Sequence, residues 1–230
     1  RLKEAAPLAC FMFQALGTHG PVLSPTTSLI LDMILLIAAF WLLATPSKKS
    51  LGDTLLLLTL VLAVSATRVL MQPLPNIQPV TVAALIVGAQ LGARRGAAFA
   101  ILVAMISNAI IGNGWWTIFQ AIGWASVALL GSKIALVVDG EIQRKRLFVA
   151  AIASAFVFDF IVSLSIIDSS FSIVTFLTYL AHGIPFDMLH ALGNLTFAVW
   201  FGSWFADVVA EDIVVEEIGL TSVESSIQHA

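Results

Sequence analysis

The chain has 230 residues, of which 59% are hydrophobic and 11% are charged, and its formal net charge is −3. With a mean hydropathy of +0.99, it has too little polar surface to cover a water-soluble globule of this length. The weak charge and the absence of a dense basic patch give no indication of nucleic-acid binding. A single cysteine, Cys10, excludes an intrachain disulfide and a thiolate metal site.

The apolar segments predict an all-α, polytopic membrane helix bundle. Their lengths are near or above the ~20 residues that cross a bilayer as a helix, unlike the ~10-residue alternating runs of a membrane barrel. We place spanning helices at 26–45, 51–71, 79–93, 96–112, 117–138, 147–165 and 185–208. The linkers between them are short, so neighbouring helices should run antiparallel in one bundle.

Three segments lie outside these spans. Residues 5–16 are apolar but too short to cross, which favours an interfacial helix. The stretch 166–184 is closed by Gly183 and Pro185, and we expect a short outer helix there. The acidic tail that begins at Glu211 is predicted to be a solvated end.

Cationic residues gather in alternate linkers. They are Lys48, Lys49, Arg94, Arg95, Arg144, Lys145 and Arg146, with Lys133 in the turn that leads to the last group. By the positive-inside rule these linkers face the cytoplasm. The pattern therefore predicts a multi-pass protein of the plasma membrane, with its N-terminus outside and its C-terminus in the cytoplasm.

A proline-rich linker forms the first of four polar clusters on the predicted outer side. Pro73, Pro75 and Pro79 bracket Asn76 and Gln78. Proline breaks helical hydrogen bonding, and irregular backbone at membrane depth is tolerated only where it is buried in protein or lines a cavity. A plain interhelix turn is an equal alternative.

The second cluster surrounds the next outer linker. It contains Asn108, Trp115, Trp116, Gln120 and Trp124. Trp116, Gln120 and Trp124 recur at four-residue spacing, so they share one helix face. Flat aromatic surface alternating with an amide suits a planar polar ligand, whereas a lone Trp near the interface would be part of an aromatic belt.

Ionisable residues inside the last spans form the third and fourth clusters. Asp187, His190 and Asn194 lie on one stripe of the last helix, and Asp159 lies in the span before it. An ionisable side chain within a span faces protein or a cavity. The alternatives are an Asp187–His190 hydrogen bond that only fixes helix packing, and a pairing of Asp159 with Arg68 or His182.

Small residues at four-residue spacing mark the opposite half. Gly88, Gly92 and Gly96 form one row, and Thr59 and Ala63 belong to another. Such rows let helices approach closely, within the monomer or at a membrane partner. The sequence has neither the glycine spacing of a phosphate-binding loop nor an HExxH pair, so we expect no nucleotide-hydrolysis site and no metal site.

A set of short motifs follows in order along residues 51–208. They are Pro75-Asn76-Ile77-Gln78-Pro79-Val80, Gly88 to Gly96 with its basic turn, Ser107-Asn108, Gly114-Trp115-Trp116-Thr117-Ile118-Phe119-Gln120, and Gly123-Trp124. Together they resemble the substrate-binding S components of energy-coupling factor (ECF) vitamin transporters. Residues 185–194 look like the start of the sixth core helix in the cobalamin-type branch. The helix at 26–45 is extra to that core, and Trp115 stands where relatives commonly have proline.

The resemblance implies a six-helix core that binds a vitamin-like solute beneath outer loops. Such a core docks on a transmembrane coupling subunit and two cytoplasmic ATPases, which alone bind ATP. It divides the chain into an N-terminal segment with the extra helix (1–50), a substrate-binding core (51–209) and an acidic tail (210–230). The expected function is a non-enzymatic capture subunit without a covalently bound cofactor, with cobalamin as the best guess for the solute.

The clusters supply the residues that we predict for each contact. For the solute they are Asn76, Gln78, Asn108, Trp115, Trp116, Gln120, Trp124, Asp159, Asp187, His190 and Asn194; for the coupling partner they are Thr59, Ala63, Gly88 and Gly92. Two alternatives remain. One is an intramembrane enzyme with Asp187 and His190 as an acid–base pair, and the other is a membrane scaffold or channel in which the glycine rows serve oligomerisation.

Overall fold

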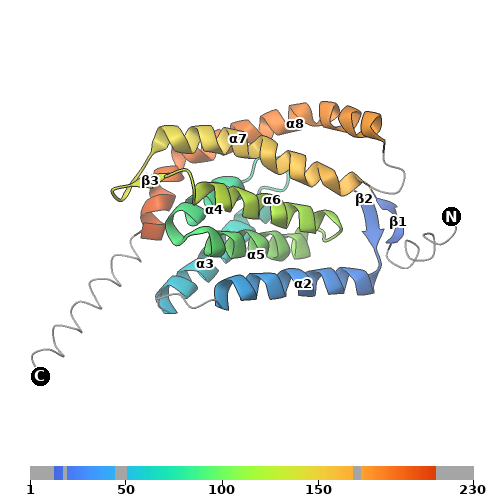
Figure 1. The fold of residues 1–230 in the computed structure, drawn as a ribbon, viewed down its shortest axis with the longest axis horizontal. Coiled ribbons are helices and arrows are strands. Elements are labelled where there is room, and N and C mark those ends of the chain that lie inside the picture. Colours follow the sequence, from blue (N-terminus) through green and yellow to red (C-terminus); the bar gives the residue numbers. More distant parts are fainter. Residues whose placement is uncertain (1–12, 18–19, 45–50, 168–171, 211–230) are drawn as a thin grey trace, which may run out of the picture.

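The computed structural model describes residues 13–17, 20–44, 51–167 and 172–210, and within them it is mainly helical (Figure 1). The elements are β1 (Phe13–Gly17), β2 (Gly20–Leu23), α2 (Pro25–Ala44), α3 (Leu51–Leu70), α4 (Val80–Leu91), α5 (Ala93–Ile111), α6 (Trp116–Gly131), β3 (Val137–Val138), β4 (Glu141–Ile142), α7 (Arg144–Ser163), the 3-10 turn η1 (Leu164–Ile166) and α8 (Ile173–Trp200). A further helical segment covers 202–210. The predicted all-α class is confirmed, with two short antiparallel hairpins added to it.

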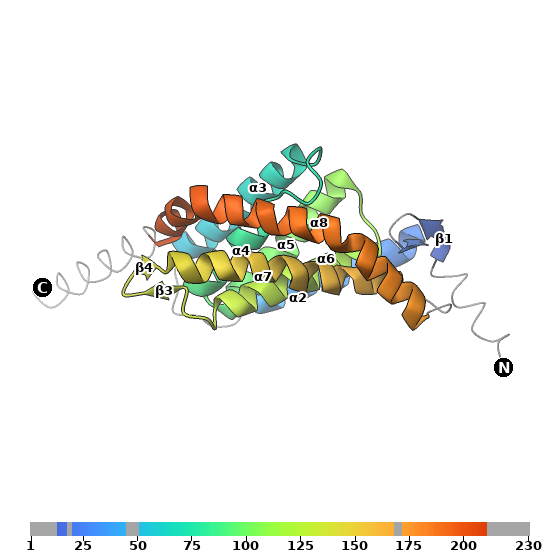
Figure 2. The ribbon, with the colours of Figure 1, turned by 90° about the horizontal axis from the view of Figure 1, so that it is seen from above.

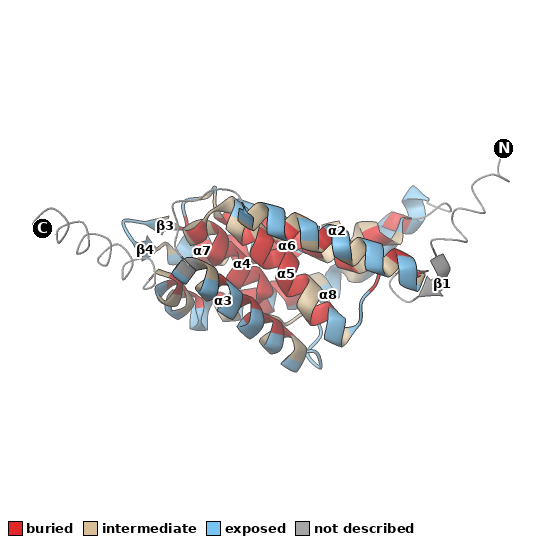
Figure 3. Ribbon diagram, turned by 90° about the horizontal axis from the view of Figure 1, so that it is seen from below, coloured by how far each residue is buried: buried red, intermediate tan, exposed pale blue. Residues whose placement is uncertain are grey.

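The helix α4 forms the centre of the bundle. It packs against α5, α6 and α7, while α2 packs on α5 and α8 packs on α7. Its residues are buried without interruption from Val80 to Gly88, as its continuous apolar sequence requires (Figure 3). Helices α3, α5, α6, α7 and α8 therefore all contact α4, whereas α2 joins the bundle through α5.

Glycines bring α4 and α6 into backbone contact. A Cβ atom added to Gly88 would lie 2.0 Å from the carbonyl oxygen of Ala128, and one added to Gly131 would lie 2.1 Å from that of Leu85. Gly88 is therefore buried within the chain and is not on the surface where we expected it to meet a partner. Gly92 separates α4 from α5 with a φ of 86°, a conformation that favours glycine.

Among the described residues, three helices are long and apolar enough to cross a membrane: Pro25–Ala44, Ala93–Ile111 and Arg144–Ile166. Large apolar side chains also cover outward faces of the bundle, as at Trp41 and Trp200. Water-soluble monomers rarely expose contiguous apolar patches of this kind. The outer surface is thus of the type that lipid covers.

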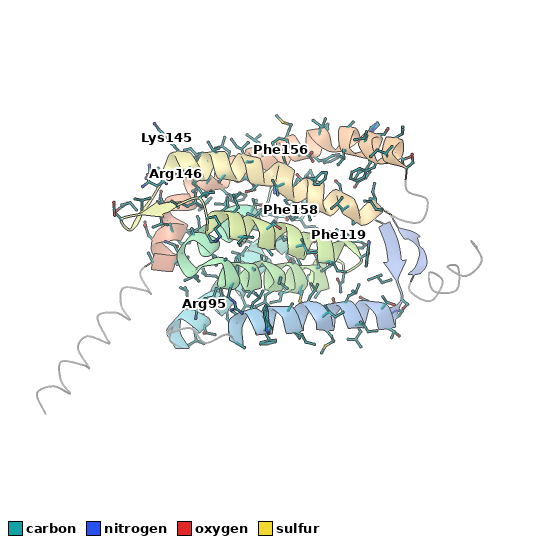
Figure 4. The ribbon with its side chains drawn as sticks, in the orientation of Figure 1. Arg95, Phe119, Lys145, Arg146, Phe156 and Phe158 are labelled. Atoms are coloured by element: carbon teal, nitrogen blue, oxygen red, sulfur yellow. The ribbon has the colours of Figure 1, made fainter. Side chains whose placement is uncertain are left out.

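The cationic residues gather at one end of the bundle, as the sequence predicted. Figure 4 shows Arg95, Lys145 and Arg146 at this end and Phe119 toward the other. Within the described segments, Arg68 is the one Lys or Arg that lies elsewhere. The α3–α4 and α5–α6 linkers lie at the end opposite the cations, whereas Lys48 and Lys49 fall outside the described residues.

The helix expected over 117–138 is shorter than predicted. It ends at Gly131, and β3 and β4 then form a hairpin. Asp139 and Gly140 occupy its turn with φ angles of 53° and 80°. A two-residue turn with both φ values positive favours an Asp-Gly pair, which is the physical reason for the hairpin.

The division of the last region into an outer helix (166–184) and a span (185–208) is wrong. A single helix, α8, runs through Pro185, and Figure 2 shows it bent along its length. Proline removes one backbone hydrogen bond and bends a helix, but packing of α8 along α7 maintains its course. The boundary instead falls at Phe201, before the segment 202–210.

The predicted interfacial helix at 5–16 is also incorrect where it can be compared. Residues 13–17 form β1, which pairs with β2. Residues 5–12 fall outside the described residues. A hairpin satisfies its backbone groups by pairing, so a short apolar run does not require a helix.

The α4–α6 contact predicts a steric penalty at one glycine. Gly88→Ala should lower the stability of the detergent-purified protein by about 1–3 kcal/mol, because its Cβ meets backbone that cannot move aside. Thermal unfolding measures this effect.

Gly183→Ala is the matched control, since this helical glycine has only an ordinary contact at 3.7 Å. It should be neutral, or stabilising by up to about 1 kcal/mol. Equal unfolding temperatures for both variants would contradict the close approach of α4 and α6.

Candidate functional site

The guanidinium of Arg68, near the end of α3, is the centre of a polar cluster inside the apolar bundle. Arg68 is only 4% exposed. Its Nε donates to Gln78 Oε1 at 3.0 Å, and its Nη1 donates to Asn108 Oδ1 at 2.7 Å and to the hydroxyl of Ser107. Its Nη2 reaches Gln120 Oε1 at 3.4 Å. One buried cation therefore connects α3 to a linker and two other helices.

The amide of Asn108 extends this cluster across the α5–α6 interface. Its Nδ2 donates to Thr117 Oγ1 at 2.9 Å and to Gln120 Oε1 at 2.8 Å, while its oxygen accepts from Arg68. All its polar atoms thus have partners in the chain. Because it is buried, water cannot replace them.

An aromatic group packs beside the guanidinium. The carbon Cζ of Arg68 lies 5.0 Å from the ring centroid of Trp124, within the range of a cation–π interaction. The Trp124 ring also stacks on Phe158, with centroids 4.5 Å apart and planes at 24°. Trp124 is therefore already engaged by protein groups, and we conclude that it positions its neighbours.

A hydrogen-bonded chain leads from Trp124 to a carboxylate. Trp124 Nε1 donates to Thr81 Oγ1 at 3.2 Å, Thr81 Oγ1 lies 3.0 Å from His190 Nε2, and His190 Nδ1 lies 2.9 Å from Asp159 Oδ2. Since the Thr81 hydroxyl accepts from the indole, it can donate its own proton to Nε2. That assignment leaves the imidazole proton on Nδ1, facing Asp159.

These groups enclose a small polar cavity of about 70 Å³, which we call the Arg68 cavity. It is lined by Arg68, Asn76, Gln78, Thr81, Gln120, Trp124, Phe158 and His190. The lining comes from α3, the α3–α4 linker, α4, α6, α7 and α8. Within the helix bundle, the cavity lies toward the end opposite the clustered Lys and Arg residues.

Five predicted solute-contacting residues line this cavity: Asn76, Gln78, Gln120, Trp124 and His190. Asn76 has a φ of 58° and donates through Nδ2 to the carbonyl of Phe186 at 3.2 Å, which ties the linker to α8.

Asn108 and Asp159 lie behind the lining. Asn108 accepts a hydrogen bond from Arg68, and Asp159 pairs with His190. The carboxyl group of Asp187 lies close enough to that of Asp159 for the two to interact electrostatically. His190 thus pairs with Asp159 on α7 rather than with Asp187 on its own helix.

Three predicted solute-contacting residues lie elsewhere. Trp115 packs edge-on against Phe119 with centroids 5.5 Å apart. Trp116 covers Gly114, where an added Cβ would lie 2.3 Å from the indole. The side chain of Asn194 is buried between helices, with Nδ2 donating to the carbonyl of Ala151 at 3.1 Å.

Sequence reasoning missed the centre of the site. Arg68 is considered there only as a partner of Asp159, and Thr81, Ser107 and Phe158 are not among the predicted contact residues. A lone arginine within an apolar segment was the available signal, since such a charge must find polar partners. The hydroxyl and phenyl groups carried no comparable signal.

The predicted partner-facing residues are divided between surface and interior. Thr59 and Ala63 are exposed on α3, and Thr59 donates to the carbonyl of Leu55 in its own helix. Ala63 lines an apolar groove of about 270 Å³ between α3, α4 and residues 197–208. Gly88 and Gly92 serve the internal packing and the helix break described above.

The chain belongs to DUF6580, a family of unknown function, which matches residues 48–212. The matched segment contains every residue that lines the Arg68 cavity. Comparisons with curated proteins and with solved structures gave no match.

The buried amide of Asn108 predicts a stability difference between two asparagines. Asn108→Ala should lower stability by about 1–3 kcal/mol, because it deprives Arg68, Thr117 and Gln120 of a partner. Thermal unfolding in detergent measures it.

Asn113→Ala is the comparison, since Asn113 is exposed on the α5–α6 linker, where water can replace its bonds. It should cost clearly less. If both variants lose the same stability, the Asn108 network does not have the role assigned to it.

Proposed function

We propose that this DUF6580 protein is an integral membrane solute-binding subunit. In this proposal it captures a vitamin-like small molecule from the outer face for an ECF-type, ATP-driven importer. The Arg68 cavity is the observation that carries the proposal. Polar side chains from five segments converge there on a cavity inside an apolar bundle, and Phe158 of α7 completes the lining.

Burying so many polar groups costs free energy unless they are paired with one another or bind a ligand. If the cluster served only to hold helices together, its groups could pack directly against one another. Arg68 does bond directly to Gln78 and Gln120, yet a cavity remains beside these groups and His190. Small-molecule sites have this character, with a few convergent polar groups in an apolar setting.

The position of the cavity supports capture from outside. The described Lys and Arg residues other than Arg68 lie at the opposite end, which the positive-inside rule assigns to the cytoplasm. The cavity then faces the outer half of the plasma membrane. The same rule gives an outer N-terminus and a cytoplasmic C-terminus.

Energy for uptake would come from partner subunits. The sequence has no phosphate-binding loop of its own. The resemblance to ECF S components implies that a coupling subunit and two ATPases act as its partners. We propose that the outward face of α3, with Thr59 and Ala63, meets the coupling subunit. The enzyme alternative is less well supported, because His190 pairs with Asp159 and not with Asp187.

The cavity predicts solute-dependent stabilisation. The full-length protein in detergent should unfold at a higher temperature with its solute, found by screening a vitamin panel that includes cobalamin. A solute at 100 times its Kd adds about 2.7 kcal/mol of stability. Gln78→Ala should weaken binding about tenfold or more, because it removes a polar group from the lining.

Gln72→Ala is the matched control, since Gln72 is exposed in the same linker. It should leave affinity unchanged. Equal losses in both variants would place the solute elsewhere. Co-expression with an ECF module tests the importer assignment. If the assignment is correct, the protein co-purifies with the ATPases of that module. If the protein purifies without them, the assignment is refuted.

A further inference from the structure

The net charge of the groups around the Arg68 cavity indicates the chemical class of its solute. Arg68 carries a full positive charge and is buried. The acceptors that it contacts are amide and hydroxyl oxygens, all of them neutral. Among the described residues, no carboxylate forms an ion pair with it within 4.0 Å.

The carboxyl group of Asp159 is paired with His190 and not with Arg68. Asp159 pairs with His190 at 2.9 Å, and the carboxyl group of Asp187 lies close enough to that of Asp159 to interact with it electrostatically. His190 in turn uses its second nitrogen for Thr81. Asp159 and Asp187 therefore belong to a separate group on α7 and α8, and Arg68 has no counter-charge in the part of the chain that the structure describes.

A buried charge is normally paired, and an intramembrane cation without a protein partner indicates a functional one. The guanidinium is suited to this role because its planar fork of donors matches a carboxylate or phosphate. Dipoles of Gln78 and Asn108 hold the fork in place when the site is empty.

We propose that the Arg68 cavity binds the anionic group of a compact organic acid, with Arg68 as its charge partner; this assignment rests on the proposed solute-binding function. The Nη2 of Arg68 is the docking point. Its bond to Gln120 is 3.4 Å long, the longest that Arg68 makes, and both residues line the cavity. An incoming anion oxygen takes the place of the amide oxygen there.

The size of the cavity favours a small acid. About 70 Å³ is far below the roughly 300–1,000 Å³ of pockets for drug-sized ligands. It admits an acidic group and little more, so the rest of the solute extends toward the α3–α4 linker at Asn76. A corrinoid is far larger than this cavity and could not enter it without a rearrangement of the linker.

Matched acid and amide probes test the assignment on the full-length protein in detergent. The pairs are nicotinate with nicotinamide and biotin with biotinamide, with inorganic phosphate and cobalamin as additional probes. We expect at least one acid to raise the unfolding temperature while its neutral amide does not. Phosphate alone among the anions would identify a phosphorylated solute.

Two variants separate charge recognition from folding. Arg68→Gln should weaken binding of the acid about 10- to 100-fold and abolish the acid-over-amide preference. Gln120→Glu supplies a carboxylate beside Arg68, so it should raise the unfolding temperature of the empty protein and block the acid. Arg146→Gln removes a charge at the opposite end of the bundle, so it should change neither the affinity for the acid nor the acid-over-amide preference.

The outcomes distinguish this inference from the proposed function. If cobalamin or the amides bind as tightly as the acids, the protein binds solutes but the anion assignment is wrong. If Gln120→Glu leaves acid binding intact, Arg68 is not its charge partner. If no probe of either charge raises the unfolding temperature, both the inference and the proposed solute-binding function are contradicted for these classes.

Discussion

The burial of one guanidinium within an apolar bundle is the constraint around which the polar side of this protein is arranged. Removing a charge from water is costly, so partners for Arg68 must arrive from several segments at once. Gln78, Asn108 and Gln120 do so from the α3–α4 linker, α5 and α6. Helix ends that could otherwise vary in position are thereby fixed around a shared point.

The glycine contacts at the other half of α4 support this arrangement. Gly88 and Gly131 bring the backbones of α4 and α6 together near the cationic end. The same two helices carry Thr81 and Trp124 to the polar end, where these side chains meet at 3.2 Å. Close packing at one end thus positions hydrogen-bonding groups at the other, and rigid elements are what a selective site requires.

The helical class, most helix positions and the clustering of cations followed from hydropathy and charge. The course of α8 through Pro185 did not, because long packing against α7 outweighs a local helix breaker. At the site, amides in a proline-rich linker and on a helix stripe predicted much of the lining. Arg68 and Thr81 were missed since their roles depend on contacts between segments distant in sequence, which spacing alone does not show.

In the proposed function, the Arg68 cavity opens to the outer face and holds a solute. Labelling of Asn76→Cys, in a background with Cys10→Ser, by a membrane-impermeant maleimide in intact cells tests it directly, because Asn76 lines the cavity. We expect the reagent to label Asn76→Cys from outside and bound solute to suppress that labelling, whereas Arg146→Cys should be labelled only after the membrane is opened. Labelling of Asn76→Cys from the cytoplasmic side alone would show that the cavity does not open to the outer face.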